Sequence, residues 1–266
     1  MRQVLVLAAV PAPRLDRLRR WGPEGWRFTG VQGWGDAVEV VRRQPVDLGV
    51  VDPLLGGAPR TLEIERLHAL FPSLPLVAYT QLGPDVAASL LALGRAGIRR
   101  ALFERFDDAP AVLRDALRDA LEASAAGQLL RALREPLGAM PGPLRLAIEG
   151  AIVNPQRPLT AVELAARAGM TRRTCERWFA RAGLPSPRVL ITLCRALYAH
   201  RLLLDPGYTV EDVAAKLGYG RARALQAQLR EVFGATAGEM RMGLTFEEAR
   251  ARVLARLLPA ASEAAS

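Results

Sequence analysis

Residues 160–170 (TAVELAARAGM) and residues 209–219 (TVEDVAAKLGY) are two copies of one motif. The second copy begins 49 residues after the first. In each copy a threonine precedes a short helix and an acidic residue follows three positions later, which is the pattern of a capping box. The pairs are Thr160 and Glu163 in the first copy and, in a looser form, Thr209 and Asp212 in the second. Each copy therefore begins a helix at a defined residue.

A glycine ends each of these short helices, at Gly169 and Gly218, and supplies a turn that a side chain would obstruct. An arginine-rich amphipathic stretch follows each turn, residues 171–182 (TRRTCERWFARA) and residues 221–233 (RARALQAQLREVF). A short helix, a glycine turn and a second helix form a helix-turn-helix motif. Two such motifs in tandem predict a protein that reads two successive stretches of the DNA major groove.

The charge distribution favours an anionic partner for the same region. The chain has a formal net charge of +9. Residues 157–241 hold 14 basic and 7 acidic residues, a surplus of 7, whereas residues 1–120 hold 16 and 14, a surplus of 2. The basic end of the chain is the end that carries the repeat, which agrees with nucleic-acid binding.

The N-terminal half alternates short apolar runs with amphipathic stretches five times, which predicts a parallel sheet with helices on both faces. The apolar runs are residues 4–10, 26–31, 48–51, 76–79 and 101–103. The amphipathic stretches lie near residues 12–20, 35–43, 60–70, 84–93 and 109–122. We expect the flavodoxin-like α/β fold, whose functional edge lies at the carboxyl ends of the strands.

At that edge, residues 1–122 resemble a response-regulator receiver domain. Asp52 (VVDPLLGG) ends the third strand, where receivers carry the phosphate-accepting aspartate, and Thr80 (VAYTQLG) ends the fourth, where they carry the phosphate-sensing hydroxyl. Receivers also have an acidic pair after the first strand, but residues 8–10 here are Ala-Ala-Val. Glu104 stands at the position of the receiver lysine, followed by Arg-Phe in place of Pro-Phe.

These departures predict a pseudo-receiver, a receiver fold that works without phosphorylation. Mg²⁺ is held by carboxylates and is needed to neutralise charge during phosphoryl transfer, so Asp52 alone is a poor site. Glu104 would place another negative charge where receivers place a cation. We expect this domain to serve in dimerisation, or in the binding of a partner or signal, and we expect no metal and no cofactor.

Residues 123–156 are expected to connect the two parts as helices around a proline- and glycine-rich break (EPLGAMPGP). The sequence leaves open whether this connector pairs with its twin in a dimer or packs on its own chain. A further helix is expected over residues 245–258, with apolar positions at Phe246, Ala249, Val253 and Leu257, and it could pack on its own domain or on a partner subunit. The last residues, ASEAAS, are expected to be disordered.

The repeat region, residues 157–243, closely resembles the AraC-type DNA-binding domain. The resemblance covers both helix-turn-helix units and the long joining segment between them (PRVLITLCRALYAHRLLLDPGYTV). It implies an all-α domain that holds two recognition helices about one DNA turn apart, roughly 34 Å. The chain is thus expected to have four parts: residues 1–122, 123–156, 157–243 and 244–266.

The resemblance also assigns DNA contacts. Arg and Glu suit direct readout, because Arg can donate to guanine O6 and N7 and Glu can accept from cytosine N4. The expected base contacts are Arg173, Glu176 and Arg177 in the first recognition helix and Arg223 and Gln226 in the second. The expected phosphate contacts are Thr171, Arg172, Arg181, Arg188, Arg221 and Arg230. Ala227, where family members often have arginine, cannot contact a base edge, so the first unit should carry most of the specificity.

The remaining reactive side chains predict no further site. Cys175 and Cys194 are expected to fill the core in a reducing compartment. His68 and His200 have no partner at metal-ligand spacing, and no catalytic constellation is present in the sequence, so no enzymatic activity is expected. No segment has the apolar length of a membrane span and no signal peptide precedes the first strand, so we expect a cytoplasmic protein.

Three functions remain open on the sequence. The first is a sequence-specific transcriptional regulator that binds double-stranded DNA, as a homodimer formed through the receiver-like domain or the connector, with RNA polymerase or another regulator as a further partner. The second is a two-component response regulator phosphorylated at Asp52. The third is a protein-interaction adaptor that has lost DNA binding, which Ala227 makes conceivable.

Overall fold

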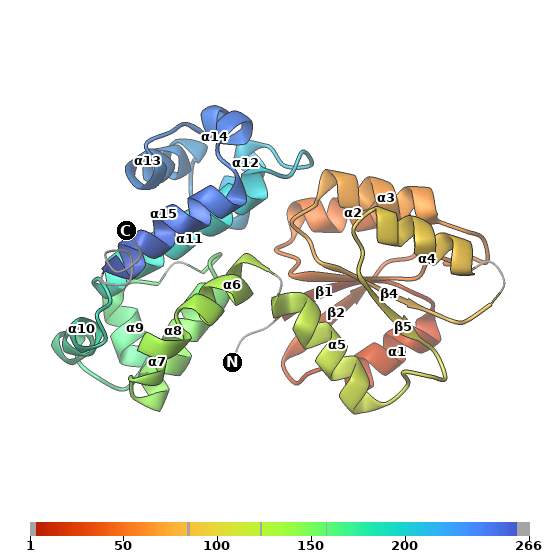
Figure 1. The fold of residues 1–266 in the computed structure, drawn as a ribbon, viewed down its shortest axis with the longest axis horizontal. Helices are drawn as coiled ribbons and strands as arrows, with labels where there is room; N and C mark the ends of the chain where they lie inside the picture. The colour runs from red at the N-terminus through yellow and green to blue at the C-terminus, as the bar shows by residue number, and fades with distance from the viewer. Residues whose placement is uncertain (1–3, 84–85, 123, 158, 260–266) are drawn as a thin grey trace. The chain divides into compact units, whose positions relative to one another are not determined.

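The computed structural model describes residues 4–83, 86–122, 124–157 and 159–259. The chain divides into two compact units. The first comprises Met1–Ser124 with Asp205–Gly207, and the second comprises Ala125–Leu204 and Tyr208–Ser266. The first unit is α/β and the second is helical, as Figure 1 shows and as the sequence predicts.

The first unit is built on a parallel five-stranded sheet of order β2-β1-β3-β4-β5. The strands are β1 (Val4–Ala9), β2 (Trp26–Gly30), β3 (Leu48–Val51), β4 (Leu76–Thr80) and β5 (Arg100–Phe103). This order confirms the flavodoxin-like fold, and each strand lies within two residues of its predicted apolar run. Because Ala9 pairs with Val51 and Thr80 with Phe103, the residues that follow these strands meet at one edge of the sheet.

Helices cover both faces of this sheet (Figure 1). They are α1 (Ala12–Trp21), α2 (Trp34–Arg43), α3 (Thr61–Leu70), α4 (Val86–Arg95) and α5 (Pro110–Glu122). Helices α1 and α5 lie on one face, and α2, α3 and α4 lie side by side on the other. Between the sheet and the α1–α5 layer, alternate strand residues such as Val6 and Val50 pack on Leu18 and Leu117 in a continuous apolar core.

In the part of the second unit that the structure describes, all regular elements are helices. They are α6 (Ala125–Ala132), α7 (Arg134–Gly138), α8 (Gly142–Val153), α9 (Ala161–Arg167), α10 (Arg172–Arg181), α11 (Pro187–Leu203), α12 (Val210–Lys216), α13 (Ala222–Phe233), α14 (Ala237–Gly243) and α15 (Phe246–Leu257). Helix α11 is the centre of the unit, since α6, α8 to α10 and α12 to α15 all contact it. Pairs α9–α10 and α12–α13 are the two predicted helix-turn-helix motifs.

Both predicted capping boxes are present, and the second is more complete than the sequence indicates. Thr160 and Thr209 each accept a hydrogen bond from the backbone N–H three residues later. Asp212 also accepts a bond from the Thr209 N–H at 2.9 Å, so the shorter acid closes its box as Glu163 does. Gly169 and Gly218 end the helices in the left-handed region, at φ of 66° and 70°, where glycine carries no steric cost.

The connector and the last helix pack on their own domain. Helices α6 and α8 contact α11, and the apolar side chains of Leu129, Leu133 and Leu137 are buried. The predicted stripe of α15 is buried as well, at Phe246, Ala249, Val253 and Leu257. Within one chain, both segments therefore pack on helices of their own domain. Residues 260–266, which include the predicted disordered tail, lie outside the described residues.

Candidate nucleic-acid interface and the carboxyl edge of the sheet

The first recognition helix, α10, turns one face into the domain and another to solvent. Cys175 and Phe179 are buried, as predicted, and burial raises the pKa of the Cys175 thiol. Arg173 and Arg177 are exposed one helical turn apart on the opposite face. Two guanidinium groups are therefore free of the core and present donors from one face of the helix.

Four of the other predicted DNA contacts already have partners in the protein. Arg172 donates to Glu176 at 2.8 Å, so a predicted phosphate contact and a predicted base contact form an ion pair on the helix surface. The Thr171 hydroxyl caps α10 by accepting from the Thr174 N–H at 3.2 Å. The Arg181 guanidinium lies over the ring of Trp178, 5.3 Å from its centre. Arg188, near the start of α11, is exposed.

The second recognition helix, α13, repeats the exposure pattern of α10. Leu225 and Leu229 are buried where Cys175 and Phe179 are buried, as the one-residue insertion after the turn predicts. Relative to this buried pair, Arg223, Gln226 and Ala227 occupy the places of the three predicted base contacts in α10. Arg223 and Ala227 are exposed and Gln226 is half-buried. The same face of α13 therefore offers fewer charged donors than that of α10.

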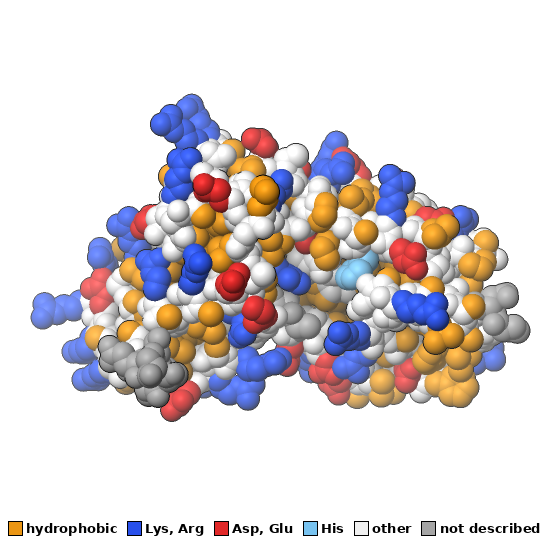
Figure 2. Space-filling model, turned by 45° about the horizontal axis from the view of Figure 1, so that its top comes forward, with side chains coloured by type: hydrophobic (Ala, Val, Ile, Leu, Met, Phe, Trp, Pro, Cys, Tyr) orange, Lys and Arg blue, Asp and Glu red, His pale blue; other side chains and the backbone are white. Residues whose placement is uncertain are grey.

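Side chains beyond the predicted set hold α13 on the central helix. Gln228 donates from Nε2 to the carbonyl of Thr192 in α11 at 3.0 Å. The Tyr219 hydroxyl donates to Oε1 of the same Gln228 side chain. The buried Arg195 of α11 donates to the carbonyl of Leu217 at 2.9 Å, at the end of α12, and lies over the Tyr219 ring. Figure 2 shows Lys and Arg side chains projecting from the surface of the second unit.

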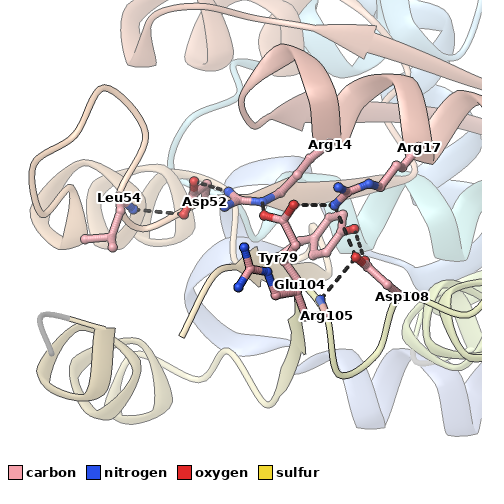
Figure 3. Close-up of polar contacts among 8 residues, drawn as sticks. All are labelled: Arg14, Arg17, Asp52, Leu54, Tyr79, Glu104, Arg105 and Asp108. Carbon is pink, nitrogen blue, oxygen red and sulfur yellow. Dashed lines mark hydrogen bonds and ion pairs between the residues drawn. The ribbon is translucent and has the colours of Figure 1, made fainter. Parts of the chain in front are cut away.

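In the first unit, the carboxyl edge of the sheet holds Asp52 in a buried ion pair. Asp52 is 2 % exposed, and its carboxylate accepts from Arg14 of α1 and from the Leu54 N–H at 3.0 Å (Figure 3). Arg14 is 7 % exposed and also donates to Glu104 at 3.1 Å. One guanidinium thus joins the end of β3 to the residue that follows β5.

A second arginine extends this network one turn further along α1. Arg17 donates to Glu104 at 2.5 Å and pairs with Asp108 at 3.2 Å (Figure 3). Tyr79, in β4, donates to the other oxygen of Asp108 at 2.7 Å. Glu104 is therefore neutralised by two guanidinium groups. The sequence predicted the negative charge of Glu104 at this edge but not these two arginines, because both come from a distant helix.

The titration of these groups follows from the same contacts. Burial acts to raise the pKa of Glu104, but hydrogen bonds from Arg17 and Arg14 outweigh it and hold the pKa below its usual value. Burial, with the bond to Asp108, raises the pKa of Tyr79 to about 12. Hydrogen bonding to Tyr79 and Glu104 raises the pKa of Arg17. Glu104 and Arg17 are therefore charged at neutral pH, and Tyr79 stays protonated beside them.

The groups at this edge do not fit a magnesium ion. The Asp52 carboxylate accepts from a guanidinium and a backbone N–H, and Ala9 and Val10 follow β1 where receivers provide carboxylates. In the described part of the chain, no group of three His, Cys, Asp or Glu side chains could hold a metal. Arg14 instead supplies a fixed positive charge beside Asp52.

Two further features distinguish this edge. Arg105 has a left-handed backbone with φ of 73°, which a proline cannot adopt, so the Pro-Phe of receivers does not suit this turn. The hydroxyl of Thr80 is buried and has no hydrogen-bond partner among the described residues. Arg14 and Arg17 were not predicted as residues of this site. The sequence signal that could have indicated them is two arginines one helical turn apart, shortly after the first strand.

Comparison with known proteins finds a family match in the second unit, over the two helix-turn-helix motifs. Residues 164–243 match the family described as "Helix-turn-helix domain". No curated protein matches the chain. Among solved structures, full-length FixJ from B. japonicum is 17 % identical with a TM-score of 0.38, and covers 82 % of this chain and 98 % of its own. RcsB from Salmonella enterica serovar Typhimurium, bound to promoter rprA, is 16 % identical with a TM-score of 0.36, and covers 71 % and 97 %.

The tandem motifs and the family match identify the second unit as carrying a helix-turn-helix DNA-binding domain of transcription regulators, and the sheet order gives the first unit the flavodoxin-like fold. Residues 164–243 are an AraC-type helix-turn-helix domain. Within the described ranges, no helix combines the length and the apolar character needed to cross a bilayer.

The buried pair of Arg14 and Asp52 leads to a stability prediction. Arg14→Met should destabilise the first unit by about 3 to 5 kcal/mol, because it leaves the Asp52 charge buried without its partner. Arg14→Met with Asp52→Leu should recover most of that loss, since an apolar pair of similar volume needs no compensation. Hydrogen exchange of the β1 and β3 amides in the full-length protein measures both effects.

Arg19→Met provides the control, because Arg19 lies on the same helix in an exposed 3.9 Å pair with Asp16. It should change stability by no more than about 0.5 kcal/mol. Equal exchange rates in Arg14→Met and Arg19→Met would show that the buried pair does not hold this edge together.

Proposed function

We propose that the chain is a sequence-specific transcriptional regulator that reads DNA mainly through α10. The observation that carries this proposal is the paired exposure of Arg173 and Arg177 on the face of α10 opposite Cys175 and Phe179. Guanidinium groups placed in this way can each donate two hydrogen bonds to a guanine. Glu176 would accept from a cytosine after releasing Arg172, which is then available to a phosphate.

Helix α13 would contribute less to sequence recognition. Arg223 and Gln226 can reach base edges, but Ala227 has no donor or acceptor where α10 has Arg177. Arg221 and Arg230 are exposed at the two ends of α13 and suit phosphate contacts. Phosphate contacts fix the position of a protein on the duplex without reading its sequence. Thr171, Arg172, Arg181 and Arg188 are proposed to serve in the same way around α10.

The receiver-like domain is proposed to work without phosphorylation. Its Asp52 carboxylate already has a permanent cation in Arg14, and Arg14 in turn is held by Glu104. An acyl phosphate on Asp52 would have to displace this pair within a buried network. The rival function is a response regulator phosphorylated at Asp52, and the buried, unpartnered hydroxyl of Thr80 favours keeping it under test.

The first unit is proposed to form the homodimer contact. Among the described residues, the connector buries most of its large apolar side chains in its own domain and exposes Leu146 of α8, which is 65 % exposed. Exposed apolar side chains also occur on segments that flank β5, an edge strand: Leu91 of α4 is 67 % exposed and Phe106 is 73 % exposed. Exposed apolar groups beside an open sheet edge suit a protein contact. RNA polymerase or another regulator is a further proposed partner.

Base readout by α10 is tested with DNA fragments selected on the full-length protein at about 0.15 M salt, which suppresses nonspecific phosphate binding. Arg177→Ala should weaken binding to the selected motif by about 1 to 3 kcal/mol and relax one base position. Arg145→Ala is the control, because Arg145 lies on α8 and pairs with Glu149 in its own helix. A uniform loss over all sequences would make Arg177 a phosphate contact.

Removal of both Arg173 and Arg177 separates the regulator from the adaptor. The double Ala variant should lose sequence-specific binding and keep its fold, because both side chains are exposed. If the wild type selects no shared motif and the variant behaves as the wild type does, the adaptor function replaces the one proposed here. If both bind a shared motif equally, residues other than Arg173 and Arg177 read the bases.

Phosphorylation is tested by incubating the protein with a small phosphodonor and Mg²⁺ and measuring its intact mass. We expect no added phosphoryl group on the wild type, because Arg14 occupies the Asp52 carboxylate. A receiver of known activity serves as the positive control. A phosphoryl adduct that disappears in Asp52→Asn would establish the response-regulator function instead.

The dimer contact is tested by sedimentation of full-length variants. Phe106→Arg with Leu91→Arg should shift the protein from dimer to monomer, because two charges would be buried in an apolar contact. Leu146→Arg, at an equally exposed apolar position on α8, should leave the dimer intact. Unchanged sedimentation in the first variant would exclude the β5 edge as the contact.

A further inference from the structure

The two recognition helices are held at their ends in different ways. Helix α10 begins at Thr171, whose hydroxyl caps the first turn, whereas α13 begins at Arg221, whose side chain makes no capping bond. An N-cap side chain stabilises a helix by about 0.5 to 2 kcal/mol. Helix α13 therefore lacks a local stabiliser that α10 has.

The other end of α10 is closed by its own chain. The N–H groups of Ala182, Gly183 and Leu184 donate to carbonyls in the last turn, at 3.0 to 3.2 Å. At the end of α13, Gly234 donates to the Arg230 carbonyl at 2.9 Å from a left-handed conformation. The intrahelical ladder does not reach the last carbonyls of a helix, which need partners from elsewhere.

Helix α15 supplies those partners from outside the matched domain. Arg252 donates to the carbonyl of Phe233 at 3.4 Å, and Arg256 donates to that of Val232 at 3.2 Å. Both carbonyls are in the last turn of α13, where the helix dipole is negative and a cation is stabilising. The family match ends at residue 243, before α15 begins.

The position of α15 is itself fixed. Val253 and Leu257 are fully buried against the domain, and α15 contacts both α11 and α13. A capping box of Thr245 and Glu248 sets its first residue. Leu244, just before α15, is bound to α11, because the buried His200 donates through Nε2 to the Leu244 carbonyl at 3.0 Å. These contacts fix the position of α15, and with it the positions of Arg252 and Arg256 beside α13.

We propose that α15 is a positioning element of the DNA-binding domain: Arg252 and Arg256 hold the end of α13 and thereby set its orientation for the second major groove. The proposal rests on the proposed DNA-binding role of α13. Neither arginine is assigned a DNA contact; each acts through the helix that it caps. The second helix-turn-helix motif then obtains from another helix the stabilisation that the first motif obtains from Thr171 and its own closing turn.

The test compares Arg252→Ala/Arg256→Ala with a control that removes the same charge, Arg250→Ala/Arg145→Ala. Arg250 lies on α15 and Arg145 on α8, and each pairs with a glutamate of its own helix, Glu247 and Glu149. Hydrogen exchange of the α13 amides is measured first, in the full-length protein without DNA. Exchange should accelerate about fivefold to thirtyfold in the first variant relative to the control.

Footprinting on a selected DNA fragment follows for the same proteins. The Arg252/Arg256 variant should lose protection of the second groove and keep that of the first, while the control keeps both. Exchange rates equal to those of the control would overturn the proposal. Accelerated exchange with both grooves still protected, or with both lost together, would also overturn it, because α13 alone should be affected.

These readouts separate this proposal from the proposed function. If wild type and control protect no DNA at all, DNA binding fails. The exchange measurement then still decides whether α15 holds α13.

Discussion

The second unit depends on the burial of α11 from every side. Five consecutive residues, Leu193 to Leu197, are buried, so no face of this helix is left to solvent. A helix that is covered all round must have neighbours all round, and here these neighbours include both recognition helices. The buried Arg195 would be costly in such a core without partners, and it obtains them from the carbonyls of Pro155 and Leu217. A single side chain thereby joins the segment before α9 to the end of α12, and it relates the two motifs through α11.

In the first unit, arginine side chains compensate the charges of buried carboxylates. Parallel strands bring Asp52 and Glu104 to one edge of the sheet, where like charges in a poorly hydrated place would repel. Receivers answer with a metal ion and a lysine, whereas this chain answers with Arg14 and Arg17 from α1. The cations beside these carboxylates are therefore side chains of the chain itself, held on α1.

Sequence patterns predicted what depends on near neighbours. The capping pairs, the glycine turns and the alternation of strand and helix involve residues at most a few positions apart, so the elements and the sheet order followed from them. The buried stripe of α15 was predicted for the same reason. The partner of Asp52 was not predicted, because Arg14 lies 38 positions away and meets it only in the folded sheet. The sequence placed Asp52 and Glu104 at this edge, but it did not predict Asp108 or the two arginines of α1 that pair with these carboxylates.

The two motifs also differ through one residue. Six positions separate Gly169 from the buried Cys175, and seven separate Gly218 from the buried Leu225. The extra residue places Arg221 at the N-cap where the first motif has Thr171, so α13 loses a capping hydroxyl. The structure restores support through contacts that the first motif does not have: Gln228 bonds to the Thr192 carbonyl, and Arg252 and Arg256 bond to the last turn. Helix α13, which has fewer exposed arginines on the predicted DNA-facing side than α10, is thus also the helix whose placement depends on contacts from distant parts of the domain.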